Sequence, residues 1–382
     1  MKLSRYVFKT PEGYLNTMTK ERLRLDASRE QLADGLFLEG QERESLEKRL
    51  FKRPNDLQLR ILPTWECNLR CKHCSVLKNL KRKDPCRINP RDVLDFCLAH
   101  MERYGHSKIN IAFVGGECLL EAKKCLEIMT ILENESGAEL NSSLTTNFAM
   151  NLTEDMVELL DKMSNFMVSL DGDEDQHNWQ RKSPDEKLNP YKKTVANLKR
   201  AVLLGLSDKM KVQAAVQDEV FDKAKKTAQI RMLTAMGIKN ISYGSCHPTV
   251  QNPEPDKMYI EALKSTAMHS KPCCEYRYMN FFSVNSDNDL YSEYYALSNR
   301  FCSLSEAKFD AIEPAYKKKI LDNLSVLKDD ICMNECPVVA YCWGKCINNE
   351  IYFEDFRNNP SKYCGRESLN KRVEMMAQAG RL

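Results

Sequence analysis

The feature that most limits the fold of this chain is an alternation of strand-like and helix-like segments between residues 57 and 243. Short apolar runs predict six strands, at residues 57–62, 108–114, 139–146, 165–170, 211–216 and 238–243. Helix-favouring stretches separate these strands, with starts at Asn89-Pro90 and Thr153 and further helices at 122–135, 191–204 and 221–236. The alternation predicts a parallel α/β sheet, which right-handed crossovers can close wholly or partly. We therefore predict a partial (β/α)6, TIM-like barrel.

The segments on either side of this alternation have a different character. Residues 1–55 combine a few aromatic positions with a charged, helix-favouring run at 41–50, and the stretch after residue 262 is rich in cysteine and aromatic residues. A chain of 382 residues is long enough for two or more domains with cores of their own. We predict a small N-terminal domain at 1–55, an α/β core at 56–261 and a cysteine-rich C-terminal domain at 262–382.

Composition restricts the class of protein. Hydrophobic residues make up 42% and charged residues 29% of the chain, a globular balance. The apolar runs are shorter than the ~20 residues needed to cross a bilayer, and no secretion signal is evident. The net charge of +3 is too small to indicate a nucleic-acid partner. We expect a cytoplasmic protein without disulfides, so metal or redox chemistry is the alternative use of its sixteen cysteines. Cys97 and Cys125 are predicted to be ordinary buried helix residues.

Polar motifs stand at the ends of four predicted strands. These motifs are the cysteine loop Cys67-x3-Cys71-x2-Cys74, Gly115-Gly116-Glu117, Thr145-Thr146-Asn147 and Ser169-Leu-Asp-Gly172. In parallel barrels the carboxyl ends of the strands carry the chemistry. We therefore predict that the four motifs converge on one active-site face.

The spacing of Cys67, Cys71 and Cys74 indicates a metal site with an incomplete set of protein ligands. A structural zinc ion or an ordinary iron–sulfur cluster takes four protein ligands. Three thiolates on a [4Fe–4S] cluster leave one iron open to a substrate or cofactor. The alternative interpretation of the triplet alone is that it supplies three of the four ligands of a zinc ion.

With the other motifs, the triplet resembles the signature of the radical S-adenosylmethionine (SAM) enzymes. The resemblance covers about residues 57–245 and includes Gly115-Gly116-Glu117 and Ser169-Leu-Asp171-Gly172 with His177 and Arg181. It implies that SAM binds the open iron of the cluster. His73 would contact the adenine, the Gly-Gly-Glu turn would hold the SAM amino group, and Ser169 and Arg181 would hold its carboxylate or ribose. Asn147 is either a ribose contact or a turn residue, and Cys118 stands where the family usually has proline.

The C-terminal cysteines resemble the SPASM extension, an auxiliary iron–sulfur domain of radical SAM enzymes that modify peptides and proteins. By that resemblance Cys332, Cys336, Cys342 and Cys364 ligate one auxiliary cluster, and Cys346 crosses over to another. A second auxiliary cluster would use Cys273 or Cys274, Cys302 and Cys346. Its expected turn has Asn288 for glycine and Glu293 for cysteine, so an altered cluster or no cluster stays an alternative. For the region as a whole, a zinc-binding subdomain is the competing interpretation.

The combined resemblance implies an oxidoreductase that matures ribosomally made peptides. Reductive cleavage of SAM would give a 5′-deoxyadenosyl radical that abstracts hydrogen from the peptide, most often leading to a thioether or carbon–carbon crosslink. Residues 1–55 would dock a leader peptide, and a flavodoxin- or ferredoxin-type protein would supply the electron. The alternatives are a sulfatase-maturase-like oxidase, which Tyr294 in place of an aspartate disfavours, and a peptide epimerase. A non-catalytic zinc-binding interaction protein is the alternative from another class.

Overall fold

The structure is a computed structural model that describes residues 2–4, 7–16, 21–34, 39, 54–74, 76, 84–216, 223–245, 279–292 and 300–324. The chain divides into two compact units. One comprises residues 1–54, 260–279 and 313–382, and the other comprises residues 55–259 and 280–312. Each unit is described by itself, beginning with the larger one.

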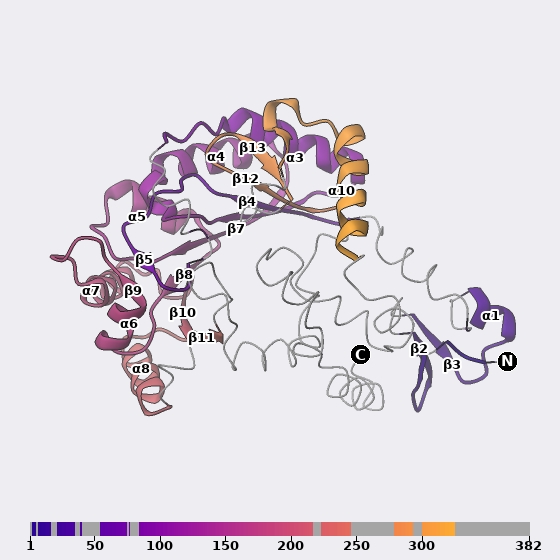
Figure 1. Ribbon diagram of the computed structural model, residues 1–382, viewed down its shortest axis with the longest axis horizontal. Coiled ribbons are helices and arrows are strands. Elements are labelled where there is room, and N and C mark those ends of the chain that lie inside the picture. Colours follow the sequence, from indigo (N-terminus) through magenta and orange to yellow (C-terminus); the bar gives the residue numbers. More distant parts are fainter. Residues whose placement is uncertain are drawn as a thin grey trace. The chain divides into compact units, whose positions relative to one another are not determined.

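The larger unit is built on a nine-stranded sheet of mainly parallel strands (Figure 1), with the strand order β11-β10-β8-β7-β6-β4-β12-β13-β14. All pairs from β11 to β12 are parallel, whereas β13 and β14 add antiparallel strands at one edge. The strands are β4 (Leu57–Ile61), β6 (Lys108–Phe113), β7 (Glu139–Thr146), β8 (Asn165–Ser169), β10 (Met210–Val216), β11 (Asn240–Ser245), β12 (Phe281–Val284), β13 (Asp289–Tyr291) and β14 (Arg300–Ser303).

The six predicted strands are confirmed as β4, β6, β7, β8, β10 and β11. Strands that follow one another along the chain are neighbours in the sheet, as successive strand–helix units produce. Within the described residues β11 and β14 are the outer strands, and no pairing between them closes the sheet. The fold is therefore α/β with an open, partly barrel-like sheet.

Helices connect the parallel strands. They are α3 (Pro90–Tyr104), α4 (Ala122–Glu135), α5 (Glu154–Lys162), α6 (Glu174–Gln180), α7 (Pro190–Leu203) and α8 (Lys223–Ala235), with a short 3-10 turn η2 (Cys118–Glu121) before α4. The predicted caps are confirmed, because Asn89 accepts a hydrogen bond from Arg91 N and Thr153 accepts one from Met156 N. Figure 1 shows α3, α4 and α5 on the same side of the sheet.

The parallel strands are buried on the helix side and half-exposed on the other. Burial alternates along β4, β6 and β8, so that Leu57, Leu59 and Ile61 are buried while Gln58 and Arg60 are not. The half-exposed face carries mainly polar side chains, namely Gln58, Arg60, Asn110, Ser143, Thr145, Ser169 and Gln213. Such a polar face is suited to contact with a ligand. An apolar face would instead pack against a second hydrophobic layer.

Strands β12–β14 were not predicted from the sequence. Phe281, Phe282, Ser283 and Val284 are all buried, and β12 pairs in parallel with β4 more than 200 residues earlier in the chain. Residues 280–312 therefore belong to the same compact unit as 55–259. The division at residue 262 stays a prediction, since most of 262–382 lies outside the described residues.

In the smaller unit, β1 (Val7–Lys9), β2 (Gly13–Asn16) and β3 (Arg22–Arg24) form an antiparallel sheet with β2 in the centre. Helix α1 (Arg29–Asp34) follows. Ser28 and Gln31 cap its start reciprocally, each side chain accepting the backbone N–H of the other residue. The predicted helical run at 41–50 lies outside the described residues. Helix α10 (Phe309–Leu324) begins in the larger unit and continues in the smaller one.

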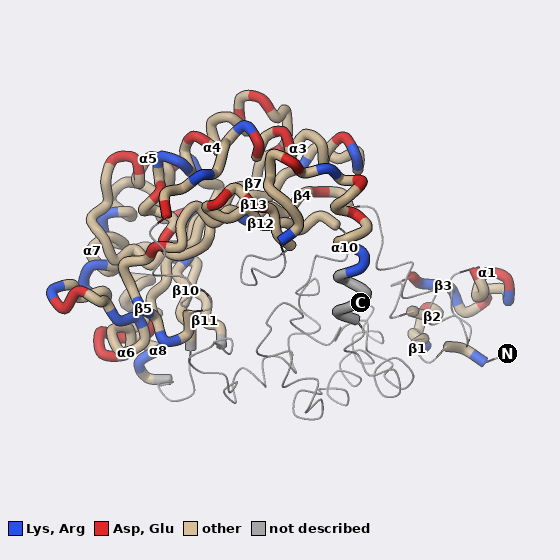
Figure 2. Tube along the Cα trace, turned by 45° about the horizontal axis from the view of Figure 1, so that its top comes forward, with Lys and Arg blue, Asp and Glu red and all other residues tan. Residues whose placement is uncertain are grey.

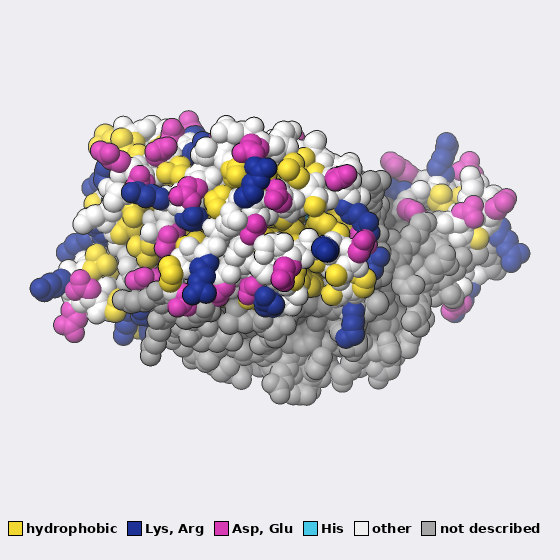
Figure 3. All heavy atoms as spheres, turned by 90° about the horizontal axis from the view of Figure 1, so that it is seen from above, with side chains coloured by type: hydrophobic (Ala, Val, Ile, Leu, Met, Phe, Trp, Pro, Cys, Tyr) yellow, Lys and Arg dark blue, Asp and Glu magenta, His cyan; other side chains and the backbone are white. Residues whose placement is uncertain are grey.

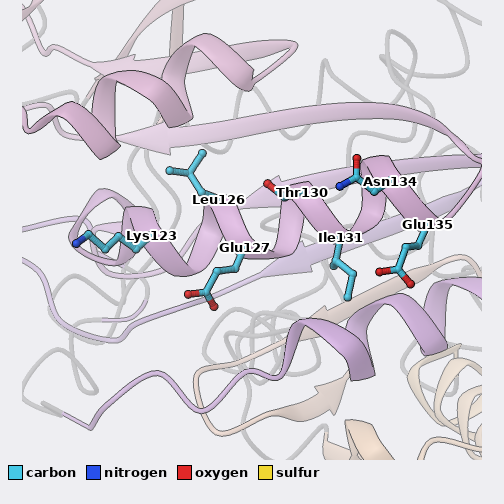
Figure 4. Close-up of a pocket in the computed structure, with 7 residues that line it drawn as sticks. All are labelled: Lys123, Leu126, Glu127, Thr130, Ile131, Asn134 and Glu135. Carbon is cyan, nitrogen blue, oxygen red and sulfur yellow. The ribbon is translucent and has the colours of Figure 1, made fainter.

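The outer helices of the larger unit carry charges of both signs. Figure 2 shows basic and acidic residues interspersed along α3, α4 and α5, and Figure 3 shows the same mixture on the surface seen from above. A shallow groove of about 580 Å³ runs along α4, lined by Lys123, Leu126, Glu127, Thr130, Ile131, Asn134 and Glu135 (Figure 4). None of the predicted site residues lines this groove. None of the described helices is long and apolar enough to span a membrane.

Candidate functional site

The cysteine loop follows β4 directly, at the carboxyl end of the sheet. Buried Leu62, Trp65 and Val76 form an apolar group against which Cys67 and Cys74 pack. Each of Cys67, Cys71 and Cys74 is a half-buried free thiol. The first and third cysteines of the loop thus rest on an apolar base.

The Gly115-Gly116-Glu117 turn lies against the backbone that leads into this loop. Gly116 N donates to Thr64 O at 3.1 Å, and Glu117 N donates to Glu66 O at 2.8 Å. A Cβ on Gly116 would lie 2.1 Å from Glu66 O, and Gly115 has a φ of 129°. Glycine is required here because two backbone segments touch.

Glu117 is fully buried and joins the ends of two strands. One of its carboxylate oxygens accepts Asn147 N at 2.8 Å, and the other accepts Leu119 N at 3.2 Å. Burial raises the pKa of Glu117 from 4.5 to about 7, against the opposing effect of these hydrogen bonds. The carboxylate is therefore a support of the turn, whichever atoms of a ligand it also meets.

Asn147, at the end of β7, is tied both to its own turn and to the cysteine loop. Its Oδ1 accepts Ala149 N at 2.8 Å, which is the geometry of a turn residue. Its Nδ2 donates to Asn68 Oδ1 at 2.8 Å and lies 3.7 Å from Cys67 Sγ. Asn68 in turn donates to Ala149 O at 2.7 Å, which closes a small network beneath the first cysteine.

The Ser-Leu-Asp-Gly motif after β8 contributes a buried ion pair. Arg181 Nε lies 2.5 Å from Asp171 Oδ2, and Asp171 Oδ1 also accepts Ala215 N at 2.8 Å. Burial raises the pKa of Asp171, but the charge and hydrogen bond of Arg181, together with His73 and His177, outweigh burial and hold that pKa below its usual range. Arg181 Nη1 lies 3.9 Å from Cys71 Sγ, so the pair also brings a positive charge to the second cysteine.

A two-stranded ribbon holds the second cysteine to the end of α6. Strand β5 (Arg70–Cys71) pairs antiparallel with β9 (Arg181–Lys182), with Cys71 opposite Arg181. Lys72 N donates to Gln180 O at 2.9 Å, and the Lys72 ammonium lies 3.1 Å from the centre of the Trp179 ring. Neither α6 nor this ribbon was predicted from the sequence.

Two histidines in this region are neutral, His177 fully buried and His73 half-buried. Burial lowers the pKa of His73 and of His177 to about 4. Gln180 Nε2 lies 3.4 Å from His73 Nδ1, and His177 Nδ1 accepts Asp171 N at 3.0 Å. The proton of neutral His177 is therefore on Nε2, which is buried and has no acceptor among the described residues.

Ser169 ends β8 on the half-exposed polar face, beside Gln213 of β10. It lies on the same sheet edge as the other predicted SAM contacts. The contacts described above connect the cysteine loop with Gly116, Glu117, Asn147 and Arg181, and Ser169 ends a neighbouring strand of the same sheet. The roles of Cys67, Cys71, Cys74, His73, Gly115, Gly116, Glu117, Asn147, Ser169 and Arg181 stay predictions.

The thiols fit a cluster better than a single metal ion. Burial raises the pKa of Cys67 to about 12, of Cys74 to about 11 and of Cys71 above its usual value, so a bound cation is needed to keep them ionised. Tetrahedral ligands of one zinc ion lie about 3.8 Å apart. In the described residues no three His, Cys, Asp or Glu side chains come close enough for that. A cluster binds each thiolate at a different iron, so its three ligands need not share one metal ion.

Other predicted ligands are separate from this site or outside the described residues. Cys302 lies on β14, near the far edge of the sheet, half-buried and unpaired. The predicted auxiliary ligands that lie outside the described residues are Cys273, Cys274, Cys332, Cys336, Cys342, Cys346 and Cys364. Glu293 and Tyr294 also lie outside them. The assignment of the cysteines to auxiliary clusters stays a prediction. Cys97 and Cys125 are buried helix residues, as expected.

Three residues that support the site were missed. Asn68, Gln180 and Trp65 contact it from the cysteine loop and from α6. For Asn68 and Trp65, their place inside or just before the cysteine loop was a usable signal. Gln180 had none, because its contact with His73 spans 107 residues.

The comparison with protein families agrees with this geometry. Residues 61–208 match the model of the Radical SAM superfamily, so the chain contains a radical SAM domain. These residues include every predicted contact to SAM and its cluster. No curated protein sequence was found to match the chain.

Several solved structures share the fold. The structure of anSMEcpe with bound AdoMet and a peptide has a TM-score of 0.53 at 17% identity, covering 83% of this chain and 99% of that one. SuiB of Streptococcus suis bound to S-adenosylmethionine has a TM-score of 0.56 at 14% identity, covering 91% and 96%. SuiB bound to its precursor peptide SuiA has a TM-score of 0.56 at 13% identity, covering 96% and 98%. At such identities the likeness shows the fold alone.

Proposed function

We propose that the protein is a radical SAM oxidoreductase that modifies a ribosomally made peptide. The observation that carries the proposal is the cysteine loop, whose Cys67 and Cys74 rest on an apolar base and whose backbone bonds the Gly-Gly-Glu turn, inside a domain that matches the superfamily. Cys67, Cys71 and Cys74 would hold a [4Fe–4S] cluster. When bound, that cluster supplies the electron that cleaves SAM to a 5′-deoxyadenosyl radical.

The residues of this chain would position SAM beside the cluster. His73, held by Gln180, would lie against the adenine, while Ser169, Asn147 and Arg181 would meet the ribose or carboxylate. Arg181 remains charged within its buried pair, so it offers a fixed donor. The turn at Glu117 would receive the SAM amino group.

The polar face of the sheet supports a peptide as substrate. Arg60, Ser143 and Gln213 are half-exposed on that face and supply hydrogen-bonding groups to a peptide backbone. The structures of SuiB with SuiA and of anSMEcpe with a peptide show that proteins of this fold bind peptides. Of the possible outcomes we favour a thioether or carbon–carbon crosslink over side-chain oxidation or epimerisation. The cytoplasm, with a flavodoxin- or ferredoxin-type reductant, is the setting that such chemistry requires.

The sheet of the smaller unit is the proposed docking place of a leader peptide. Strands β1 and β3 are its outer strands among the described residues, so either can accept an added strand. Asn16 N donates to Glu21 O, and Thr10 N donates to Gly13 O. Hydrogen-bonded and non-hydrogen-bonded pairs alternate along antiparallel strands, so the N–H groups of Lys9 and Arg24 point away from β2.

Proline at these two positions tests the docking proposal. Lys9→Pro or Arg24→Pro removes an outward donor without breaking a bond to β2. We expect one of them to weaken precursor binding at least tenfold in a fluorescence titration, while Lys9→Ala and Arg24→Ala do not. Unchanged affinity in both proline variants would contradict strand addition.

The central test of the proposed function uses the second cysteine. Anaerobically purified protein should be brown and contain about 8–12 irons per chain if two or three clusters are present. Cys71→Ala should abolish SAM cleavage, whereas Cys86→Ala, a half-buried thiol outside the loop, should retain it. Persistent cleavage in Cys71→Ala, or a colourless zinc protein, refutes the proposal. A loss of two hydrogens from the peptide by mass spectrometry would indicate a crosslink.

A further inference from the structure

The indole of Trp65 carries a buried donor without an acceptor. Trp65 is 1% exposed, and its Nε1 has no hydrogen-bond partner among the described residues. Leaving such a group unpaired is unfavourable, because no hydrogen bond offsets the loss of its contact with water. Buried tryptophans usually find a partner for their N–H, so an orphaned one indicates an acceptor that binds separately.

The surroundings of Trp65 identify that acceptor by its chemistry. Trp65 forms an apolar group with Leu62 and Val76, and Cys67 and Cys74 pack directly against this group. Its backbone lies close to the Gly-Gly-Glu turn, since a Cβ on Gly116 would lie 2.6 Å from Trp65 O. Two of the three predicted sulfur ligands therefore pack against the apolar group that contains the indole ring. The acceptors that a bound cluster adds to such a place are thiolate and sulfide sulfur atoms.

We propose that Trp65 Nε1–H donates a hydrogen bond to a sulfur atom of the iron–sulfur site and thereby sets its reduction potential. Trp65 is a positioning residue in this proposal, which rests on the proposed function of the cysteine loop. A hydrogen bond to cluster sulfur stabilises the reduced, more negative state. The donor should therefore raise the potential and ease the transfer of an electron to the cluster.

The test measures the midpoint potential of the full-length protein in Trp65→Phe. Phenylalanine keeps an aromatic ring and removes the N–H. The signal of the SAM-binding cluster is identified by its change on addition of SAM and by its loss in Cys71→Ala, which separates it from auxiliary clusters. We expect the potential from EPR-monitored titration to shift to more negative values in Trp65→Phe, with iron content unchanged.

A matched control and a second variant keep the outcome decisive. Trp179→Phe removes the N–H of a ring that the Lys72 ammonium already covers, and it should keep the wild-type potential. If Trp65→Phe loses iron, replacement of Trp65 by 3-benzothienylalanine substitutes sulfur for the N–H and keeps the shape of the ring. An unchanged or more positive potential in the variant that retains the cluster overturns the proposal. If no cluster forms on Cys67, Cys71 and Cys74 in the wild type, the proposed function fails instead.

Discussion

At the scale of single residues, the site depends on side chains that connect backbone segments as much as on those expected to touch a ligand. Glu117 joins the turn after β6 to the end of β7, and Arg181 joins Asp171 to the cysteine loop. Both are buried ionisable groups, so their energetic contributions depend on charge and on pH.

Glu117 should make the protein less stable as the pH rises through the range below neutrality. Its pKa is raised from 4.5 to about 7, so between these values the folded state holds a proton that the unfolded state has released. The contribution of Glu117 to the free energy of unfolding is fully present below pH 4.5. It is lost as the pH rises toward 7, by roughly 3 kcal/mol at most. Glu117→Gln cannot ionise and should lack this loss. Guanidinium unfolding measures the free energy of unfolding at pH 5 and at pH 8. Relative to the wild type, Glu117→Gln should be more stable at pH 8 than at pH 5. A constant difference between the two would contradict the assigned cause.

Arg181→Met should leave a buried carboxylate without its partner. Removal of one member of a buried pair costs roughly 3 kcal/mol, because Asp171 is fully buried. Lys239→Met is the control, since the Lys239–Asp208 pair is exposed, with side-chain exposures of 82% and 85%, and should contribute little. Equal midpoints of unfolding for the two variants would show that the Asp171 pair is not energetically important.

At the scale of elements, the cysteine loop is shaped by segments that follow three other strands. The turn after β6 pairs with residues 64–66, the turn after β7 holds Asn68, and β9 pairs with β5. A parallel sheet makes this convergence possible because its strands all end at the same edge.

Gly116→Ala should separate the Gly-Gly-Glu turn from the cysteine loop. The added Cβ would meet Glu66 O at 2.1 Å, so backbone must move, at a cost of roughly 3 kcal/mol. Gly137→Ala is the matched control, because its Cβ has nothing within 4 Å and only its φ of 63° opposes alanine, which costs about 1 kcal/mol. Iron content after anaerobic reconstitution should fall in Gly116→Ala alone. Normal iron in that variant would show that the clamp is not needed for the cluster.

At the scale of the whole larger unit, distant parts of the chain complete the sheet. Phe282 on β12 makes edge-on contacts with Phe96 and His100 of α3 and with Phe309 of α10, at ring separations of 5.2, 5.9 and 6.3 Å. These contacts hold residues 280–312 to helices formed almost 200 residues earlier.

Phe282→Ala should destabilise the whole larger unit rather than one edge. Phe282 is 1% exposed, and its truncation leaves a cavity that costs roughly 4 kcal/mol. Leu203→Ala removes a side chain that is 88% exposed and should change stability little. Circular dichroism and tryptophan fluorescence should report one shared, lowered unfolding midpoint for Phe282→Ala. Separate transitions for the two probes would show that β12–β14 form an independent part.

The sequence by itself determined the parallel strands, the caps at Asn89 and Thr153, and the strand-end position of every motif. These features depend on local hydrophobic periodicity and on neighbours within a few residues, which a sequence displays directly. The tertiary structure alone decided the pairing of β12 with β4, the β5–β9 ribbon and the unpaired indole of Trp65. Those features depend on burial and on contacts between residues more than 100 positions apart, and neither leaves a periodic trace in the chain.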